Sequence, residues 1–438
     1  MCIRDRILER LITFYANYKN TRESILPMLN KIYGDLLRRQ GELEEAEKRY
    51  SEAERLYKKK QDDLGLANTL KSRGDLLRRQ GELEKAEEKY REAEELYRKE
   101  RAALGLANTL KSQGDLLRRQ GKLEEAGKKY REAEELYKRE QANLGIANTL
   151  KSQGDLLRRQ GKLEEVEKKY KEAETLYKKV QDNLGLANML KSQGDLLMRQ
   201  WKLGEAEKKY EKSEELYRKL KANLGLANTF RSQGEYLKRR GKLEEAEEKY
   251  EGAEELYKKI GANLGLANTF LCRGDLLSLR GNLGEAKDKY EETEKLYKKE
   301  QDNLGLANTF LAEGDLLRRQ GKLEEAEKKY GEAERLYKKV QDNLGLTNTL
   351  QSRGDLLLRR EQLEEAEKKY EEAEGLYKKQ QDLEGYLLVL FKLRKCYKET
   401  GNPRISQMES LVQNKIDEIP YKEIEWYIHL KMDMDFEY

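Results

Sequence analysis

Apolar residues recur along this chain at helical spacing, in two stripes per repeat of 40 residues. In residues 182–217 the members of each stripe are three or four residues apart, which places them on one face of a helix. The first stripe consists of Leu184, Ala187, Leu190, Gly194 and Leu197. The second consists of Leu203, Ala206, Tyr210, Ser213 and Tyr217. The pattern predicts one antiparallel helical hairpin in each repeat, with one apolar face on each helix.

Small and polar residues mark the ends of these helices and the places where they meet. Most repeats have a glycine between the two stripes, which predicts the end of the first helix and a tight reversal. We expect Asp182 or Asn183 to cap the start of the first helix. We also expect Gly194 and Ala206 to face each other across the hairpin, with Tyr210 filling the space beside them.

The unit occurs nine times without an insertion or a deletion between copies. Its Gly194 position is occupied in turn by Gly34, Gly74, Gly114, Gly154, Gly194, Gly234, Gly274, Gly314 and Gly354. A fixed period of this length predicts a stacked array in which each hairpin covers the apolar face of its neighbour. We expect an N-terminal segment at 1–26, the nine-unit array at 27–385, a degenerate terminal repeat with a capping helix at 386–419, and a tail at 420–438.

Both ends of the chain depart from the repeat. The first six residues, MCIRDR, resemble a translated transposon-end tag, and we interpret them as a sequencing scar; a natural start is the alternative. If they are a scar, we expect the natural protein to extend upstream. The tail carries Trp426, Tyr427, Phe436 and Tyr438 among acidic residues. We interpret it either as a docking peptide or as a further helix packed on the end of the array.

Composition narrows the class of protein. The 89 Lys and Arg residues nearly balance 84 Asp and Glu residues, which is not the charge of a polyanion-binding protein. The three cysteines, Cys2, Cys272 and Cys396, lack metal-ligand spacing and favour a reducing compartment. No apolar run is long enough for a membrane span. We therefore expect a cytoplasmic protein without a metal.

The candidates for catalysis are few. His429 is the single histidine, and no glycine-rich phosphate loop occurs. Carboxylate pairs such as Glu164 and Glu165 recur in nearly every second helix, where Glu and Lys four residues apart stabilise a solvated face. A catalytic pair would be expected once rather than in every unit. We therefore expect a non-enzyme without a cofactor.

The repeated positions resemble the tetratricopeptide repeat. In residues 147–177 the matching positions are Leu150, Gly154, Leu157, Gly161, Tyr170 and Ala173. The resemblance implies an all-α, right-handed superhelical solenoid of antiparallel helix pairs whose first helices line a concave surface. The period of 40 residues resembles the longer subclass, which includes adaptors and the sensor arms of signalling ATPases. A leucine usual in the motif is replaced by Gln153, so that layer is expected to be more polar.

The resemblance also implies which side chains would bind a partner's peptide in the concave groove. The asparagines in this set are Asn108, Asn148, Asn188, Asn228, Asn268 and Asn308. The basic residues are Lys111, Lys151, Lys191, Arg119, Arg159 and Arg199. An asparagine can both donate to and accept from a peptide backbone, or it can instead tie neighbouring helices together. Aspartates within helical reach, such as Asp155, are expected to pair with much of the basic charge.

Two consecutive units replace this polar pattern by leucine. Leu271 and Leu311 stand at the lysine position, and Leu279 stands at an arginine position. If the three leucines form an apolar subsite for a partner, they should be exposed in the free protein. Sequence drift without a binding role is the alternative.

These observations predict a scaffold for protein–protein interaction that binds an extended or helical peptide in its concave groove. The basic columns favour a peptide with acidic groups, and we expect a monomer that does not bind membranes. The first alternative is the sensor arm of a larger signalling ATPase whose other domain lies upstream. A weaker alternative is a polyanion or RNA binder, which the lack of an aromatic platform disfavours.

Overall fold

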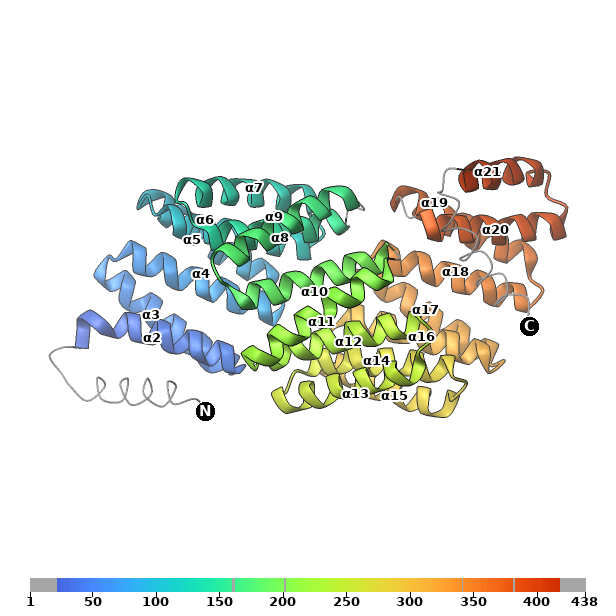
Figure 1. Ribbon diagram of the computed structural model, residues 1–438, viewed down its shortest axis with the longest axis horizontal. Coiled ribbons are helices and arrows are strands. Elements are labelled where there is room, and N and C mark those ends of the chain that lie inside the picture. The colour runs from blue at the N-terminus through green and yellow to red at the C-terminus, as the bar shows by residue number, and fades with distance from the viewer. Residues whose placement is uncertain (1–21, 160–161, 201, 341, 381–382, 418–438) are drawn as a thin grey trace. The chain divides into compact units, whose positions relative to one another are not determined.

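The computed structural model describes residues 22–159, 162–200, 202–340, 342–380 and 383–417, and the regular elements in these ranges are α-helices. The first helices of the pairs are α2 (Arg22–Gln40), α4 (Asp63–Gln80), α6 (Ala103–Arg119), α8 (Asn143–Arg159), α10 (Asn183–Arg199), α12 (Asn223–Arg239), α14 (Asn263–Leu279), α16 (Asn303–Arg319), α18 (Asn343–Arg359) and α20 (Leu383–Thr400). The second helices are α3 (Leu43–Lys60), α5 (Leu83–Lys99), α7 (Leu123–Arg139), α9 (Leu163–Lys179), α11 (Leu203–Leu220), α13 (Leu243–Ile260), α15 (Leu283–Lys299), α17 (Leu323–Val340), α19 (Leu363–Gln380) and α21 (Ile405–Asp417). The predicted fold class, an all-α solenoid of antiparallel helix pairs, is confirmed (Figure 1).

The chain forms two compact units, residues 1–196 and 197–438, and the division falls inside α10. In the first unit α4 packs on α5 of its own pair, α5 packs on α6 of the next pair, and the first helices α4 and α6 also touch. The same order recurs in the second unit for α12, α13 and α14. The MCIRDR segment and the tail at 420–438 lie outside the described residues.

Two kinds of turn connect the helices. At the end of α4, Gly81 has a φ of 86°, and its backbone N–H and that of Glu82 donate to carbonyl oxygens of the last helical turn. This is the predicted glycine C-cap. The turn from a second helix to the next first helix has the same geometry, but Gln141 occupies its left-handed position with a φ of 53°. In the equivalent position of a later repeat stands Gly261, with a φ of 67°.

The start of the first helix is capped as predicted in some units. The Asp182 side chain accepts a hydrogen bond from the Gly185 backbone N–H at 3.1 Å, so Asp182 rather than Asn183 is the cap. In α6 and α12 the corresponding residues are Ala102 and Ala222, which make no side-chain cap.

Gln141→Gly should stabilise the fold. A left-handed conformation costs an L-residue about 1–2 kcal/mol, and glycine avoids this cost. Glycine also loses more conformational entropy on folding, which offsets part of the gain. We expect a net gain of about 0.5–1 kcal/mol in the free energy of unfolding, measured by urea denaturation. The adjacent Glu140 has a φ of −84°, and its replacement by glycine is the control. Glu140→Gly should lower stability, and equal effects of the two variants would contradict this account.

In most first helices a glycine lies directly against a tyrosine ring of its own hairpin. A Cβ atom placed on Gly114 would lie 2.6 Å from Cε1 of Tyr130, and one placed on Gly314 would lie 2.5 Å from Cε1 of Tyr330. Real Cβ atoms are essentially never that close to another heavy atom. The tyrosine ring therefore fills the space beside the glycine, as predicted from the sequence.

A second glycine joins one hairpin to the next. A Cβ atom placed on Gly105 of α6 would lie 2.2 Å from Cε1 of Tyr97, which belongs to α5 of the preceding hairpin. Gly305 and Tyr297 repeat this contact at 2.3 Å between α15 and α16. Each hairpin thus uses one tyrosine to close on itself and another to pack on its neighbour.

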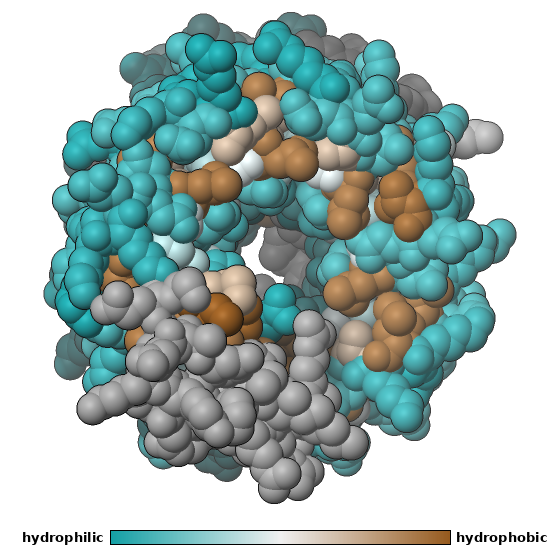
Figure 2. All heavy atoms as spheres, turned by 90° about the vertical axis from the view of Figure 1, so that its left-hand side faces the viewer, coloured by the Kyte–Doolittle hydropathy of each residue, from teal (hydrophilic) through white to brown (hydrophobic). Residues whose placement is uncertain are grey.

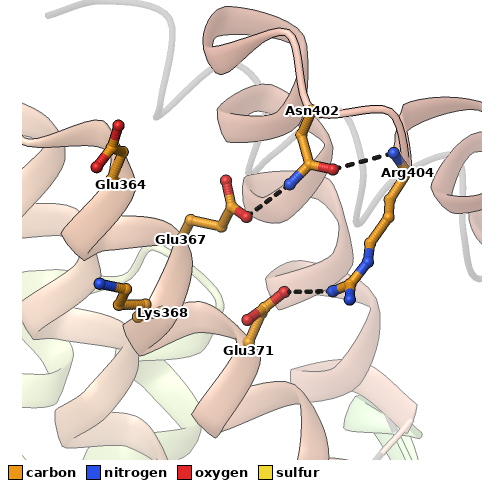
Figure 3. Close-up of a pocket in the computed structure, with 6 residues that line it drawn as sticks. All are labelled: Glu364, Glu367, Lys368, Glu371, Asn402 and Arg404. Atoms are coloured by element: carbon orange, nitrogen blue, oxygen red, sulfur yellow. Dashed lines mark hydrogen bonds and ion pairs between the residues drawn. The ribbon is translucent and has the colours of Figure 1, made fainter.

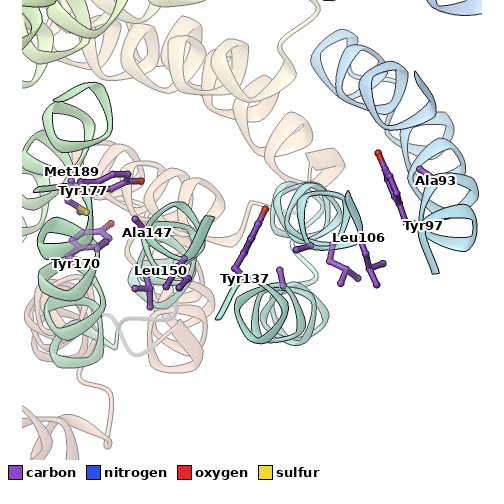
Figure 4. Close-up of a cluster of buried hydrophobic side chains, with 14 of the residues drawn as sticks. Ala93, Tyr97, Leu106, Tyr137, Ala147, Leu150, Tyr170, Tyr177 and Met189 are labelled. Carbon is purple, nitrogen blue, oxygen red and sulfur yellow. The ribbon is translucent and has the colours of Figure 1, made fainter. Parts of the chain in front are cut away.

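The buried core of the first unit runs continuously through successive hairpins. One cluster includes Tyr97 from α5, Leu106 from α6, Tyr137 from α7, Leu150 from α8 and Met189 from α10 (Figure 4). All five side chains are buried. A single hairpin would leave one side of this cluster in water, so stacking supplies much of the apolar burial.

One predicted core position is wrong. Leu184 is 49% exposed, whereas Ala187 and Leu190 of the same predicted stripe are buried. Six residues before Leu190, an α-helix has turned by about 120° away from that side chain. Steps of three residues accumulate this rotation, so Leu184 projects beside the core rather than into it. Seven other repeats have a leucine with similar exposure in this position.

Gly314→Ala should be strongly destabilising because the new methyl group would overlap the Tyr330 ring. Overpacking of a closed core typically costs about 1–3 kcal/mol. Gly331→Ala is the matched control, since it lies in the adjacent helix α17 and a Cβ there meets nothing within 4 Å. That variant should gain up to about 1 kcal/mol from helix propensity. Urea unfolding of both variants measures the difference, and a harmless Gly314→Ala would refute the contact.

Candidate binding surface on the first helices

The residues expected to bind a partner lie in first helices, and a hydrogen-bonded network connects them to the second helices. In α6, the Lys111 ammonium donates to Oδ2 of Asp115 at 2.9 Å. The Tyr130 hydroxyl donates to Oδ1 of the same carboxylate at 2.7 Å. Burial opposes ionisation of Asp115, but the Lys111 charge and these hydrogen bonds outweigh it, so the pKa of Asp115 is lowered. The carboxylate therefore stays charged and holds both partners.

The three predicted lysines all make this pair. Lys151 donates to Asp155 at 2.9 Å, and Lys191 donates to Asp195 at 2.7 Å. Each lysine is half-buried. The expectation that aspartates neutralise much of the basic charge is confirmed for these pairs, so a ligand would have to share or displace them.

Four of the six predicted asparagines accept a hydrogen bond from the second tyrosine of their hairpin. Oδ1 of Asn108 accepts from the Tyr137 hydroxyl at 2.6 Å, and Oδ1 of Asn148 accepts from Tyr177 at 2.8 Å. The same bond joins Asn228 to Tyr257 and Asn308 to Tyr337, at 2.6 Å each. Nδ2 of Asn188 and of Asn268 donates to a backbone carbonyl one turn earlier, at 2.9 and 2.6 Å. The four asparagines bonded to tyrosine tie two helices together, whereas these two bonds of Asn188 and Asn268 lie within one helix. All six remain at least partly accessible.

The predicted arginine position connects consecutive first helices. The Arg119 guanidinium donates to the backbone oxygen of Arg78 at 2.8 Å, near the end of the preceding first helix. Arg319 makes the same contact with the Ser278 backbone oxygen at 2.8 Å. Cationic groups are favourable at helix C-termini because the last carbonyls have no helical partner. The side chains of Arg159 and Arg199 lie outside the described residues.

The leucine substitutions do not form the exposed patch expected from the sequence. Leu279 is 43% exposed at the end of α14. Leu271 is only partly exposed and packs on a core cluster that includes Tyr290, and Leu311 packs in the same way on Tyr330. Both leucines are half-buried because they pack at the interface between their own hairpin and the next one.

Replacing lysine by leucine changes the electrostatics of the neighbouring aspartate. Asp275 accepts from the Tyr290 hydroxyl at 2.8 Å, but its own helix has Leu271 where α6 has Lys111. Burial raises the pKa of Asp275 to about 6, against the opposing effects of Lys238 and the Tyr290 hydrogen bond. The nearby carboxylates Glu235 and Asp315 raise it further. The sequence analysis did not predict the raised pKa of Asp275. The signal for it was Leu271, which stands four residues earlier in place of the usual lysine.

Exposed leucines at the position of Leu184 recur in other repeats. The sequence pattern predicts that this position lies in the core. These leucines, here called the leucine row, are Leu64, Leu104, Leu144, Leu184, Leu224, Leu264, Leu304 and Leu344, with exposures between 42% and 54%. Each lies one turn before an asparagine, as Leu104 does before Asn108. On the face drawn in Figure 2, hydrophilic residues predominate and hydrophobic residues gather in separate patches among them.

A surface cavity of about 450 Å³ lies between α19 and the segment that leads into α21 (Figure 3). Glu364, Glu367, Lys368, Glu371, Asn402 and Arg404 line it. Its polar groups largely bond one another: Asn402 donates to Glu367 at 2.7 Å, and Arg404 pairs with Glu371 at 3.0 Å. These bonds fasten the last helices together, so we interpret the cavity as a structural joint.

Among the described residues, no group of three or more acidic, histidine or cysteine side chains could hold a metal ion. No described helix is long and apolar enough to cross a membrane.

The sequence model of the tetratricopeptide repeat matches residues 24–99, 105–179, 265–339 and 305–379, which together exceed half of the chain. The chain belongs to the tetratricopeptide repeat family. A search of curated protein sequences finds no match to this tetratricopeptide repeat protein.

Solved structures share the fold of this tetratricopeptide repeat protein at low sequence identity. A Rap protein complexed with competence and sporulation factor has a TM-score of 0.54 and 15% identity, over 89% of this chain and 99% of that one. Aspartyl phosphate phosphatase F from Bacillus subtilis has a TM-score of 0.50 and 14% identity, over 91% and 95%. A signal transduction ATPase with a tetratricopeptide repeat sensor from Pyrococcus horikoshii has a TM-score of 0.51 and 16% identity, over 80% of this chain but only 54% of that one.

Replacing Asp275 by Asn should make the protein more stable above pH 6. The folded pKa of Asp275, about 6, exceeds the usual value near 4, so the folded chain holds the proton more tightly. The contribution of Asp275 to stability therefore falls as the pH rises from about 4 to about 6. At about 1.4 kcal/mol per pKa unit, the variant should gain about 1–3 kcal/mol at pH 7 and little at pH 4.

Asp115→Asn is the control for this titration, because its folded pKa is lowered rather than raised. It should be destabilising because Lys111 loses its partner, and this loss should stay nearly constant from pH 4 to pH 8, since the lowered pKa of Asp115 keeps the carboxylate charged over that range. Urea unfolding from pH 4 to pH 8 measures both variants. Parallel pH profiles for the two would contradict the electrostatic difference between α6 and α14.

Proposed function

We propose that this protein is an interaction scaffold that binds a peptide segment of a partner protein across its first helices. Tetratricopeptide repeats serve as protein–protein interaction modules, and this family membership supports the general role. The leucine row is the observation that supports the location. Leu104 and Leu144, each 45% exposed, lie beside the accessible amides of Asn108 and Asn148. Apolar and hydrogen-bonding groups are thus presented together, as a peptide site requires.

The regular step between units favours a linear ligand. Packed helices lie about 8–10 Å apart, and consecutive first helices such as α4 and α6 touch. Three residues of extended peptide span about 10 Å, and so do seven residues of an α-helix. A partner whose apolar side chains recur at either interval would meet one leucine per repeat.

Charge favours an acidic segment in the first unit. In α4 the surface has Lys71, Arg78 and Arg79 against the single carboxylate of Asp75. Lys71 forms an ion pair with Asp75 at 2.7 Å. Arg79 donates to the uncharged backbone oxygen of Arg38 at 2.7 Å, so this bond does not neutralise its charge. Two positive charges per repeat therefore exceed the local carboxylate charge, which would attract an acidic peptide.

A second candidate is the sensor arm of a signalling ATPase. The fold shared with the Pyrococcus horikoshii signal transduction ATPase, which has a tetratricopeptide repeat sensor, favours it. In this case the first-helix surface would bind a regulatory ligand, and recovery of the upstream reading frame would distinguish the candidates. An ATPase domain encoded there would support the sensor arm, and its absence would leave the scaffold.

Selection of peptides from a random library on the full chain tests the proposal. Peptides that bind should lose about 1–3 kcal/mol of affinity in the double variant Leu104→Lys and Leu144→Lys, because each leucine buries apolar surface in the complex. Thr175→Lys is the control, since it introduces a lysine at an exposed position of the second helix α9. Peptides unaffected by the double variant, in a protein that remains helical by circular dichroism, would place the site elsewhere.

A further inference from the structure

The second unit has an exposed apolar surface in its first helices. Leu224, Leu264, Leu304 and Leu344 of the leucine row are 54%, 43%, 42% and 46% exposed. They start α12, α14, α16 and α18, and these first helices touch in sequence. Four leucines at steps of about 8–10 Å make a row about 24–30 Å long.

Two of the four helices that carry this part of the row, α14 and α16, are more apolar than the first helices of the first unit. α14 has Leu271 and Leu279 where the earlier repeats have lysine and arginine, and α16 has Leu311. Leu279 is 43% exposed, and the other two are half-buried. Repeated exposure of leucine on neighbouring helices is typical of a surface that another segment covers.

The same chain contains a segment with a complementary pattern. Residues 423–438 read EIEWYIHLKMDMDFEY, in which apolar and mostly charged residues alternate. The apolar members are Ile424, Trp426, Ile428, Leu430, Met432, Met434, Phe436 and Tyr438. Strict alternation is the pattern of an extended strand with one apolar face, whereas the repeats follow the helical period.

We propose that residues 423–438 lie extended across the leucine row of the second unit in their own chain, with the apolar face on Leu264 and Leu304. This proposal rests on the proposed function, because it makes the segment an internal occupant of the peptide site. A partner peptide would then have to displace it, and the free protein would be autoinhibited.

The length of the chain allows this arrangement. The 21 residues from 418 to 438 follow α21 and can span at most about 69–76 Å. Moving from α20 across three first helices to α14 needs about 24–30 Å. Covering the row itself takes about eight extended residues, or about 26 Å. These two lengths together are shorter than the maximum span of the 21 residues, so residues 423–438 can reach Leu264 without any change in the helices.

The charge of the segment also fits. Its polar face has five carboxylates and one lysine, Lys431. On α12, the basic residues Arg231, Lys238 and Arg239 outnumber the single carboxylate Glu235. On α16, by contrast, Arg318 and Arg319 are balanced by Glu313 and Asp315. An acidic segment beside α12 would lower the local excess of positive charge there.

Trp426 offers a direct probe, because Trp201 is the other of the two tryptophans. In the full chain with Trp201→Phe, we expect Trp426 emission to be blue-shifted and shielded from acrylamide. The added variants Leu264→Lys and Leu304→Lys should release it, so that quenching rises to that of a free peptide of residues 420–438. The matched control, Leu104→Lys with Leu144→Lys in the first unit, should leave Trp426 shielded.

A second pair of substitutions keeps the test independent of the array. Met432→Lys and Met434→Lys lie in the segment itself and should also release Trp426, with unchanged helicity by circular dichroism. Shielding that depends on protein concentration, with dimers by light scattering, would show that a second copy holds the segment and would overturn the proposal. So would a Trp426 that is solvated in the parent, or one that stays shielded in both sets of variants.

These results are separable from the proposed function. If selected peptides bind the first-helix surface while Trp426 is solvated throughout, the peptide site remains and the internal occupant is refuted. If both hold, a selected peptide that competes for Leu264 and Leu304 should increase acrylamide quenching of Trp426 as it binds.

Discussion

The packing of a tyrosine ring on a glycine backbone is the contact on which this structure depends. It occurs once inside a hairpin, as between Tyr130 and Gly114, and once between hairpins, as between Tyr97 and Gly105. In both cases the ring lies where any side chain on the glycine would be. The helices can therefore approach closely only in one register, because a shift of one residue would put a side chain against the ring. The 40-residue period follows from this constraint, since a changed loop or helix length would break one of the two contacts.

The tyrosines also explain why the candidate binding residues have two roles. The hydroxyl of Tyr130 reaches Asp115, and that of Tyr137 reaches Asn108, so buried rings deliver polar groups to the surface of the first helix. A buried hydroxyl needs a hydrogen-bond partner, and these surface residues supply it. A ligand would thus meet side chains whose positions are already fixed, which lowers the entropy lost on binding. Substituting the asparagine would disturb both the ligand site and the helix pair.

Much of the fold could be predicted from the sequence, because the helical period, the glycine turn and the repeat length each act over a few residues. The prediction that Leu184 lies in the core is wrong because steps of three residues rotate a stripe around the helix. The sequence alone does not show how far along the helix the neighbouring helices cover it. The partner of Asn108 is 29 residues away, so its hydrogen bond became visible only once the hairpin was built. The same holds for Leu271 and Leu311, whose side chains turn into the joint between hairpins. The elevated pKa of Asp275 required knowledge of burial, although the missing lysine was visible in the sequence.

The second tyrosine contact makes the joints between neighbouring hairpins chemically alike. Gly105 receives Tyr97 in the same way that Gly305 receives Tyr297, so a hairpin does not distinguish one neighbour from another by this contact. Duplication or loss of a whole unit inside either compact unit would rebuild the same joint without altering a single loop. Recombination between copies of the gene would therefore produce longer and shorter arrays that fold. The binding surface could lengthen by one leucine and one asparagine at a time, and natural variation in repeat number would tune the length of the peptide it holds.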